Sequence, residues 1–233
     1  MNKETFISEL KKLNITLTEL QLNQLERYYD LLLEWNKKIN LTRIIEKEDA
    51  YLKHFYDSLT ISKIIDLNKN YKVCDVGSGA GFPGIVLKIV YPQLDIVLVD
   101  SLNKRIVFLN EVIKELNLEG IKAIHTRMET YSKEEKEKFD IITSRAVSKC
   151  NIITEISIQS LKIGGHLILM KGICDEELEQ STEIIKNTNC KIEKVEKLEL
   201  PVEKSSRTLI DIVKLGTTPS KYPRSIDKIK KSL

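Results

Sequence analysis

The sequence is poor in the residues that cross-link small secreted proteins or bind structural metals. Its 233 residues include 4 cysteines and 3 histidines. Cys74, Cys150, Cys174 and Cys190 form no Cys-x-x-Cys pair, and no histidine lies near them at the spacing of a zinc site. The pattern excludes a disulfide-rich scaffold, and we expect reduced thiols and no bound metal.

Long apolar runs and a strong excess of one charge are also missing. No apolar run approaches the roughly 20 residues that cross a bilayer. The first residues, MNKETFISELKKLN, are charged and amphipathic, unlike a secretion signal. The net charge of +3 is too small to indicate nucleic-acid binding by itself. We therefore expect a cytoplasmic monomer that has no membrane partner.

The carboxyl-terminal tail, residues 214–233, departs from this charge balance. It contains six Lys or Arg residues against Asp227 alone. A solvated basic end and a segment that lies along nucleic-acid phosphates both fit this composition. Candidate phosphate contacts are Lys37, Lys38, Arg43, Arg224 and the rest of the tail.

The first seventy residues carry helical patterns. Thr18 and Gln21 form a capping box, after which apolar residues recur at helical spacing as far as Leu33. A second helical pattern covers residues 48–67. We expect residues 1–70 to form a helical segment that packs on a sheet built by the rest of the chain.

Strand patterns follow from residue 71 onward. Apolar runs at 72–76, 95–100, 121–126, 139–144 and 166–171 alternate with helical segments, which predicts a parallel doubly wound sheet. Two further runs, at 190–200 and 207–215, have no helix between them and should pair as an antiparallel hairpin at the sheet edge. Residues 71–233 therefore predict a Rossmann-like α/β domain of the class I methyltransferase plan, with a basic tail.

The segment DVGSGAGFPG, residues 75–84, contains two overlapping glycine motifs. Glycine lets the chain turn sharply off a strand and bring backbone amides against a ligand in either motif. The motif that starts at Gly77 follows the strand directly, whereas the dinucleotide motif starts at Gly79. Counted from Gly77, Phe82 falls where a dinucleotide site needs a small residue. The Gly77 register is favoured, and an NAD-dependent oxidoreductase remains an alternative.

The charge of Asp75 distinguishes between the two candidate cofactors. A carboxylate just before the turn repels a pyrophosphate but suits a ligand with ammonium and sulfonium charges and no phosphate. S-adenosylmethionine is such a ligand, and its carboxylate can bind the amides of the loop and the positive end of the next helix. The alternative is that Asp75 only caps the loop.

Residues after the second and third strands fit the adenosine part of such a ligand. Asp100 ends the second strand, where an acid binds ribose hydroxyls in either class of cofactor. Met128 and Glu129 follow the third strand, where the adenine ring needs an apolar contact and an acceptor. Taken alone, these two are better explained as ordinary loop residues.

The end of the fourth strand, FDIITSRAVS, indicates the methyl acceptor. It has no Asn-Pro-Pro-Tyr cluster for an exocyclic adenine nitrogen, and Cys150 is better explained as a buried structural thiol than as a nucleophile. Ser144 and Arg145 occupy the place instead. A ring nitrogen such as N7 of guanine needs positioning but no base, which is compatible with this pair. Arg145 can bind the guanine edge, a phosphate or the cofactor, or tie the strand end to a carboxylate.

Seven stretches together resemble the family of bacterial ribosomal RNA small-subunit methyltransferase G, also called glucose-inhibited division protein B. They are WNKKINLTRI (35–44), HFYDSL (54–59), DVGSGAGFPGIVLKI (75–89), VDSLNKRIVFLNEV (99–112), RME (127–129), FDIITSRAVS (139–148) and YPR (222–224). The resemblance covers nearly the whole chain. It implies S-adenosylmethionine-dependent formation of 7-methylguanosine in the decoding-region loop of 16S rRNA, in free RNA or in the small subunit.

The resemblance also implies roles for single residues. Cofactor contacts fall on Gly77, Phe82, Met128, Glu129 and Arg145, to which the argument above adds Asp75, Gly79 and Asp100. No catalytic base is implied. His54, Arg145 and Arg224 are candidate substrate contacts, and His54 with Asp57 can equally form a structural hydrogen-bonding pair. A methyltransferase for another RNA or a small molecule, and a binding module without activity, remain alternatives.

Overall fold

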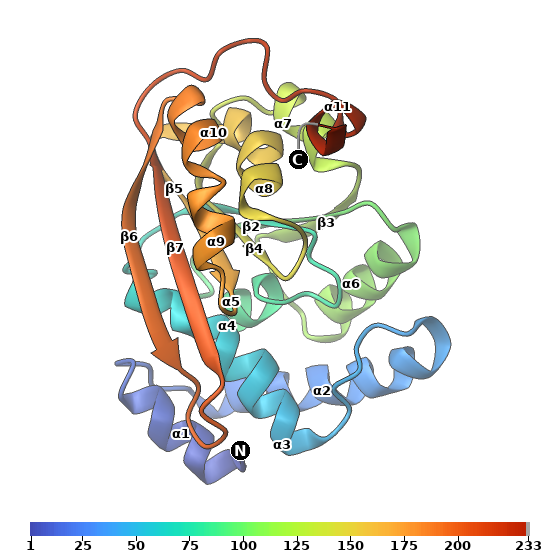
Figure 1. Ribbon diagram of the computed structural model, residues 1–233. Coiled ribbons are helices and arrows are strands. Elements are labelled where there is room, and N and C mark those ends of the chain that lie inside the picture. Colours follow the sequence, from blue (N-terminus) through green and yellow to red (C-terminus); the bar gives the residue numbers. More distant parts are fainter. Residues whose placement is uncertain (232–233) are drawn as a thin grey trace.

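A seven-stranded sheet with the order β3-β2-β1-β4-β5-β7-β6 forms the centre of the computed structural model, which describes residues 1–231 (Figure 1). The strands are β1 (Lys72–Val76), β2 (Asp95–Asp100), β3 (Ile121–His125), β4 (Phe139–Arg145), β5 (Leu161–Lys171), β6 (Cys190–Glu199) and β7 (Ser206–Lys214). β1 to β5 are parallel, and β7 is antiparallel to both β5 and β6. The predicted sheet and its terminal hairpin are confirmed.

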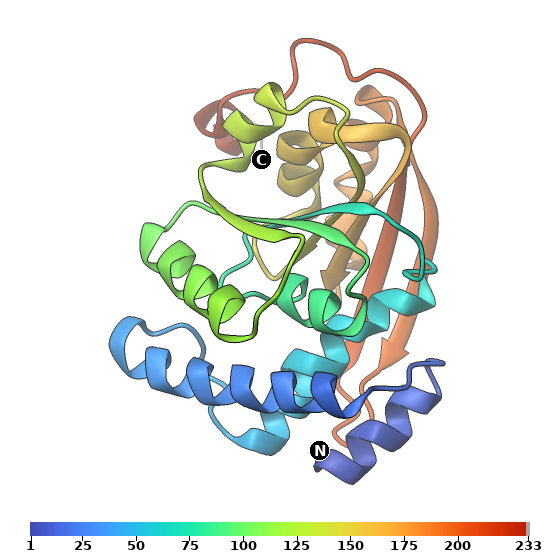
Figure 2. The same cartoon turned by 180° about the vertical axis from the view of Figure 1, so that it is seen from behind.

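Helices cover both faces of the sheet (Figures 1 and 2). The longer ones are α1 (Lys3–Lys11), α2 (Glu19–Ile39), α5 (Gly84–Val90), α6 (Asn103–Glu115), α7 (Met128–Glu134) and α8 (Cys150–Ser157). The shorter ones are α3 (Lys47–Ala50), α4 (Asp57–Leu59), α9 (Asp175–Glu179), α10 (Thr182–Asn187) and α11 (Ile226–Lys231). None of the helices within residues 1–231 is both long and apolar enough to cross a membrane.

The alternation of side chains along the strands creates two separate cores. In β2, Ile96 and Leu98 pack in the core that contains α2, α5 and α6, whereas Val97 and Val99 pack in the core beneath α7 and α8. Successive residues of a strand point to opposite faces, so a fully apolar strand supplies both cores at once. This explains why the central strands read as continuous apolar runs.

Side chains of helix α2 donate hydrogen bonds to the carbonyl groups at the carboxyl ends of α5 and α6. Its capping box between Thr18 and Gln21 is present as the sequence predicts. The Gln21 amide nitrogen also donates to the carbonyl oxygens of Ile89 and Val90, at 2.9 and 3.1 Å, where α5 ends. Gln24 does the same for Leu116 at the end of α6, at 2.9 Å. Terminal carbonyls of a helix have no partner within the helix, so these side chains join the N-terminal segment to the sheet layer.

The second predicted helix, over residues 48–67, is not one regular α-helix. A π-helical turn, Tyr51–Tyr56, separates α3 from α4, and a 3-10 turn, Thr60–Lys63, ends the segment. The π-helical turn carries Lys53 and His54, which both bind Arg145 at the end of β4. The irregularity therefore coincides with the contact between the N-terminal segment and the sheet.

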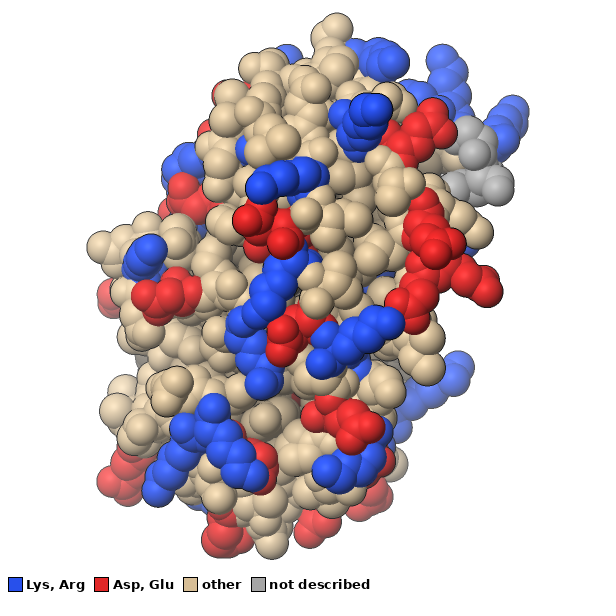
Figure 3. Space-filling view, turned by 60° about the vertical axis from the view of Figure 1, so that its left-hand side comes forward, with Lys and Arg blue, Asp and Glu red and all other residues tan. Residues whose placement is uncertain are grey.

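The hairpin presents mixed charge at the sheet edge. On β6, Lys191 pairs with Glu193 and Lys194 with Glu196 at 3.1 Å. The side of the molecule that carries the hairpin shows Lys and Arg interspersed with Asp and Glu rather than a continuous basic patch (Figure 3). Charged side chains on an edge strand oppose pairing with another chain, which is a structural use of this pattern.

The pair formed by the half-buried His166 and the buried Asp211 gives the stability of the sheet a pH dependence. The two side chains lie 3.0 Å apart between β5 and β7, and this hydrogen bond raises the pKa of His166 above its ordinary value of 6.5. The stabilisation is fully present below that value and is lost as pH rises through the pKa of the folded protein. We expect the melting-temperature advantage of the wild type over His166→Gln to shrink by about 2 °C between pH 6 and pH 9.

Thermal melts at both pH values test this expectation. His125→Gln serves as the matched control, because His125 is exposed. An advantage over His166→Gln that is the same at both pH values would contradict the role of the pair.

Candidate functional site

Two adjoining cavities open at the carboxyl ends of the parallel strands, where the strand order reverses between β1 and β4. The larger one, of about 350 Å³, is lined by Leu41, Thr42, His54, Gly77, Ser78, Gly79, Ala80, Phe82, Asp100, Ser101, Arg105, Arg145, Ala146 and Val147. The smaller one, of about 230 Å³, is lined mainly by Val76, Val99, Met128, Glu129 and three isoleucines of α8. Both include Gly77, Asp100 and Val147. This edge is where parallel α/β sheets bind ligands.

The glycine loop follows β1 in the register that starts at Gly77. Gly77 and Gly79 have φ values of +68° and +60°, which side chains disfavour. The Gly77 amide donates to the Val99 carbonyl at 2.8 Å, and the Gly79 amide donates to Asp100 at 2.9 Å. Among residues 1–231, the Ala80 amide has no acceptor, and Ala80 lines the larger cavity.

Asp75 lies beneath the loop and does not line either cavity, contrary to the expectation that its carboxylate faces the ligand. Its position in β1, two residues after Val73, places it on the α5 face of the sheet. There one oxygen accepts the Gly84 amide at 3.0 Å, at the start of α5. Burial raises its pKa to about 7. The residue therefore supports the loop from behind.

Asp100 stands between the two cavities. Its carboxylate accepts the Gly79 and Leu102 amides, each at 2.9 Å, and the Arg105 guanidinium at 3.1 Å. These bonds fix the acid at the end of β2, where the residue lines both cavities. Such an acid suits a pair of neighbouring hydroxyls.

The smaller cavity has the apolar lining that an aromatic ring requires. Met128 is 4% exposed, and Glu129 lies beside it at the start of α7. Sequence reasoning missed the opposite wall, which consists of Ile152, Ile153 and Ile156. The apolar spacing of α8 predicts a buried helix face, but it carries no signal that part of this face meets a ligand.

Arg145, the last residue of β4, is held by the N-terminal segment. Its guanidinium donates to the Lys53 carbonyl at 2.8 Å, to Asp57 at 3.3 Å and to Nδ1 of His54 at 3.2 Å. It also lies over the Phe82 ring, with its central carbon 5.1 Å from the ring centroid. Asp57 accepts Arg207 of β7 at 3.2 Å as well, so one buried carboxylate serves two cations.

His54 is neutral in this arrangement. Its ring stacks on Phe82 at a centroid distance of 4.1 Å and is 5% exposed. Burial and the Arg145 charge lower its pKa to about 3. His54 lines the larger cavity and bonds the N-terminal segment to the sheet through Arg145, whereas no hydrogen bond joins it to Asp57 within residues 1–231. A contact of His54 with the substrate stays a prediction.

The turn after β4 separates the two cavities. Val147 is 43% exposed, yet its side chain covers Gly77: a Cβ atom on that glycine would lie 2.5 Å from Val147 Cγ2. Ala146, before it, has a φ of 55°. Val147 therefore lies between the cavities. A side chain in place of Gly77 would require Val147 to move.

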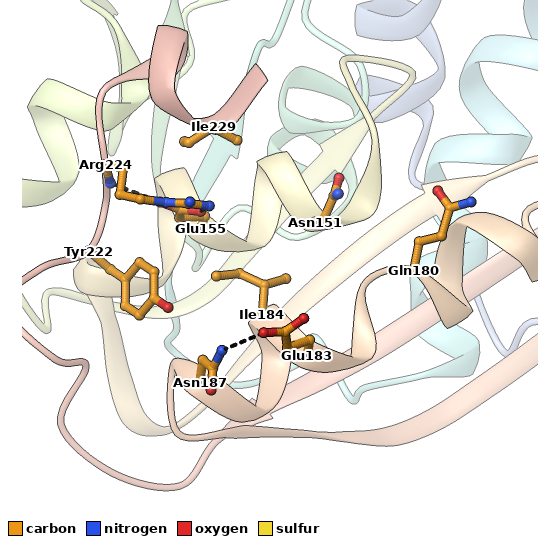
Figure 4. A pocket seen from close by; sticks show the side chains of 9 residues that line it. All are labelled: Asn151, Glu155, Gln180, Glu183, Ile184, Asn187, Tyr222, Arg224 and Ile229. Carbon is orange, nitrogen blue, oxygen red and sulfur yellow. Dashed lines mark hydrogen bonds and ion pairs between the residues drawn. The ribbon is translucent and has the colours of Figure 1, made fainter. Parts of the chain in front are cut away.

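Arg224 lies outside these two cavities, in a separate hollow beside α8 and α10 (Figure 4). Its Nε and Nη2 donate to the two oxygens of Glu155 at 2.8 and 2.6 Å, and its backbone amide donates to Glu155 at 2.9 Å. The Glu155 side chain is 1% exposed. The geometry makes Arg224 an anchor of the tail, and a phosphate contact by this residue stays a prediction.

We expect Arg224→Ala to destabilise the protein by about 2 kcal/mol, because it leaves the buried Glu155 carboxylate without its cation. In thermal melts this corresponds to a fall of roughly 4 to 8 °C. Arg127→Ala is the control, because the Arg127 side chain is 66% exposed and 3.8 Å from its acid. An unchanged melting temperature together with weaker RNA binding would instead favour the phosphate contact.

Solved structures share this fold at low sequence identity. A precorrin-6y C5,15-methyltransferase from Geobacter metallireducens GS-15 matches 68% of this chain and 87% of its own, with a TM-score of 0.52 and 15% identity. A mutant 16S rRNA (adenine(1408)-N(1))-methyltransferase from Catenulisporales acidiphilia matches 65% and 88%, with a TM-score of 0.54 and 12% identity. These likenesses establish the class I methyltransferase fold and nothing narrower.

Full-length relatives are much more similar. Proteins named ribosomal RNA small subunit methyltransferase G from Staphylococcus carnosus (strain TM300) and Macrococcus caseolyticus (strain JCSC5402) are 44% and 47% identical. The alignments cover 100% and 96% of this chain and 98% and 95% of those proteins. The family model described as rRNA small subunit methyltransferase G matches residues 21–210. The chain therefore belongs to the rRNA small subunit methyltransferase G family.

Proposed function

We propose that the protein transfers a methyl group from S-adenosylmethionine to N7 of one guanine in the decoding-region loop of 16S rRNA. Family membership supports the methyl transfer and the ribosomal RNA substrate. The observation that carries the choice of atom is the chemistry of the strand end at Arg145, which offers donors and no free base. We also propose that the protein acts as a monomer, in the cytoplasm, with the ribosomal small subunit or its RNA as the partner.

The residues of the two cavities fit S-adenosylmethionine. The Asp100 carboxylate would accept hydrogen bonds from the ribose hydroxyls of the cofactor. The smaller cavity beside Met128 is apolar and suits the adenine ring. The Ala80 amide and the Arg145 guanidinium would hold the carboxylate of the methionine part. When bound, the cofactor supplies a methyl group on a sulfonium. Asp75 would support the loop through the Gly84 amide rather than contact the cofactor.

No side chain at the end of β4 is ready to remove a proton. Ser144 donates its hydroxyl to the Val76 carbonyl at 3.0 Å. Asp57 is bound to two guanidinium groups, and Nδ1 of His54 accepts from Arg145. An exocyclic amine must lose a proton during methylation, whereas N7 of guanine carries none. The geometry therefore favours N7, where alignment of the base is sufficient.

RNA can approach from the side of the N-terminal segment. Lys37 and Arg43 are exposed and lie along the chain on either side of Leu41 and Thr42, which line the larger cavity. Lys38 is less available to RNA, because it pairs with Glu34 at 2.9 Å.

Contacts between Lys or Arg and phosphates make RNA binding salt dependent, so we expect the Michaelis constant for RNA to rise with salt concentration.

The decisive experiment is methyl transfer from radiolabelled S-adenosylmethionine to small ribosomal subunits from cells that lack this gene. Mass mapping of the modified nucleotide should reveal a single 7-methylguanosine in the decoding-region loop. Cofactor binding without incorporation into subunits or free 16S rRNA would instead indicate another RNA, a small molecule, or a protein that only binds.

Asp100→Asn tests the cofactor site. Asparagine can still accept the Gly79 amide, but it lacks the charge that strengthens bonds to hydroxyl groups, so we expect the dissociation constant for S-adenosylmethionine to rise roughly tenfold. Calorimetric titration measures this change. Asp95→Asn, at the other end of β2, is the matched control, because the Asp95 side chain is 55% exposed and far along the strand. Equal affinities for the two variants would contradict the assigned site.

A further inference from the structure

The larger cavity has a second wall that the cofactor assignment does not use. One wall consists of the glycine loop with Asp100 and Ser101, and the other is contributed by Leu41, Thr42 and His54 from the N-terminal segment. Thr42 is fixed in place, because its backbone amide donates to Asn36 of α2 at 2.8 Å. The first wall would hold the cofactor, so the second faces the molecule that receives the methyl group.

The Arg145 guanidinium sets the direction of a chain of hydrogen bonds through this wall. A guanidinium only donates, so Nδ1 of His54, 3.2 Å from Arg145, must accept. A neutral imidazole then carries its hydrogen on Nε2. Nε2 lies 3.1 Å from Oγ1 of Thr42, so the hydroxyl oxygen accepts from His54. Burial and the neighbouring Arg145 charge, which lower the pKa of His54, keep the ring in this neutral form.

Thr42 is consequently a donor with no remaining capacity to accept. Its oxygen also accepts the Ile44 amide at 3.0 Å, which occupies the second lone pair. Within residues 1–231 the hydroxyl hydrogen has no acceptor, and the residue lines the cavity. The wall thus offers the base a hydroxyl that can only donate.

We propose that Thr42 selects guanine over adenine by donating its hydroxyl hydrogen to O6 of the target base. The proposal rests on the function proposed above. Beside N7, guanine carries the acceptor O6, whereas adenine carries an amino group that donates. A hydroxyl that can only donate pairs with O6 of guanine and leaves the amino group of adenine facing another donor, which is costly in a desolvated site. His54 is the positioning residue that fixes the polarity of Thr42.

Thr42→Val and Thr42→Ser test the proposal in methyl transfer to small subunits that carry guanine at the target position. Valine has nearly the shape of threonine and no hydroxyl, and we expect it to lower kcat/KM for RNA tenfold or more. Serine should retain activity within about threefold. The dissociation constant for S-adenosylmethionine should stay within twofold of the wild type in both. Thr130→Val, at an exposed threonine outside the larger cavity, is the control.

His54→Phe tests the polarity without altering Thr42. Phenylalanine preserves an aromatic ring beside Phe82 but donates nothing, so the Thr42 oxygen regains a lone pair and can accept from an amino group. Subunits with adenine at the target position should therefore compete with guanine subunits more strongly for this variant than for the wild type. His54→Gln, whose amide can accept from Arg145 and donate to Thr42, should keep the wild-type discrimination.

Any other outcome of these experiments counts against the proposal. Full activity of Thr42→Val removes the role of the hydroxyl, and a matching loss of S-adenosylmethionine affinity assigns the hydroxyl to the cofactor. Equal losses in Thr42→Val and Thr42→Ser with lowered melting temperatures indicate a structural role. If the wild type methylates no guanine at N7, the proposed function fails and this inference fails with it, whereas an active wild type with an unaffected Thr42→Val overturns the inference alone.

Discussion

The buried guanidinium of Arg145 is the interaction on which the cleft depends. It joins the last residue of β4 to the Lys53 carbonyl, Asp57 and His54, all of which lie in the N-terminal segment. A buried cation requires paired charge and filled hydrogen bonds, and only the folded helical segment supplies them. The strand end, the segment and the cavity between them are therefore formed together.

A second set of contacts joins the same segment to the glycine loop. The Tyr28 hydroxyl of α2 donates to the Ala80 carbonyl, and Gln21 and Gln24 close the ends of α5 and α6. Tyr28 is buried between Phe55 and Phe82, with ring centroids 5.9 and 5.3 Å away. The helical segment thus shares a core with one face of the sheet, and it holds the glycine loop through Tyr28.

This arrangement gives the two parts of the cleft different characters. The parallel sheet contributes backbone amides, the Asp100 carboxylate and an apolar cavity, a combination that fits a cofactor with a ribose and an adenine ring. The N-terminal segment contributes the chain from Arg145 through His54 to Thr42, in which every group has a fixed hydrogen-bonding direction. Relatives that are similar over their whole length, such as the Bacillus subtilis (strain 168) protein at 43% identity, match both parts of the chain.

The sequence by itself determined the fold and the family. Continuous apolar runs, helical spacing and the Gly77 register are local properties, so they predicted the parallel sheet, the hairpin and the position of the glycine loop. The motifs around Trp35, His54 and Arg145 identified the family, which the comparisons confirm. Tertiary structure decided what individual side chains face. The alternation of side chains along β1 places Asp75 on the α5 face, and the buried Glu155 pairs with Arg224. Contacts among Thr42, His54 and Arg145 make the Thr42 hydroxyl a hydrogen-bond donor. These outcomes depend on groups far apart in the chain, whose contacts no local pattern specifies.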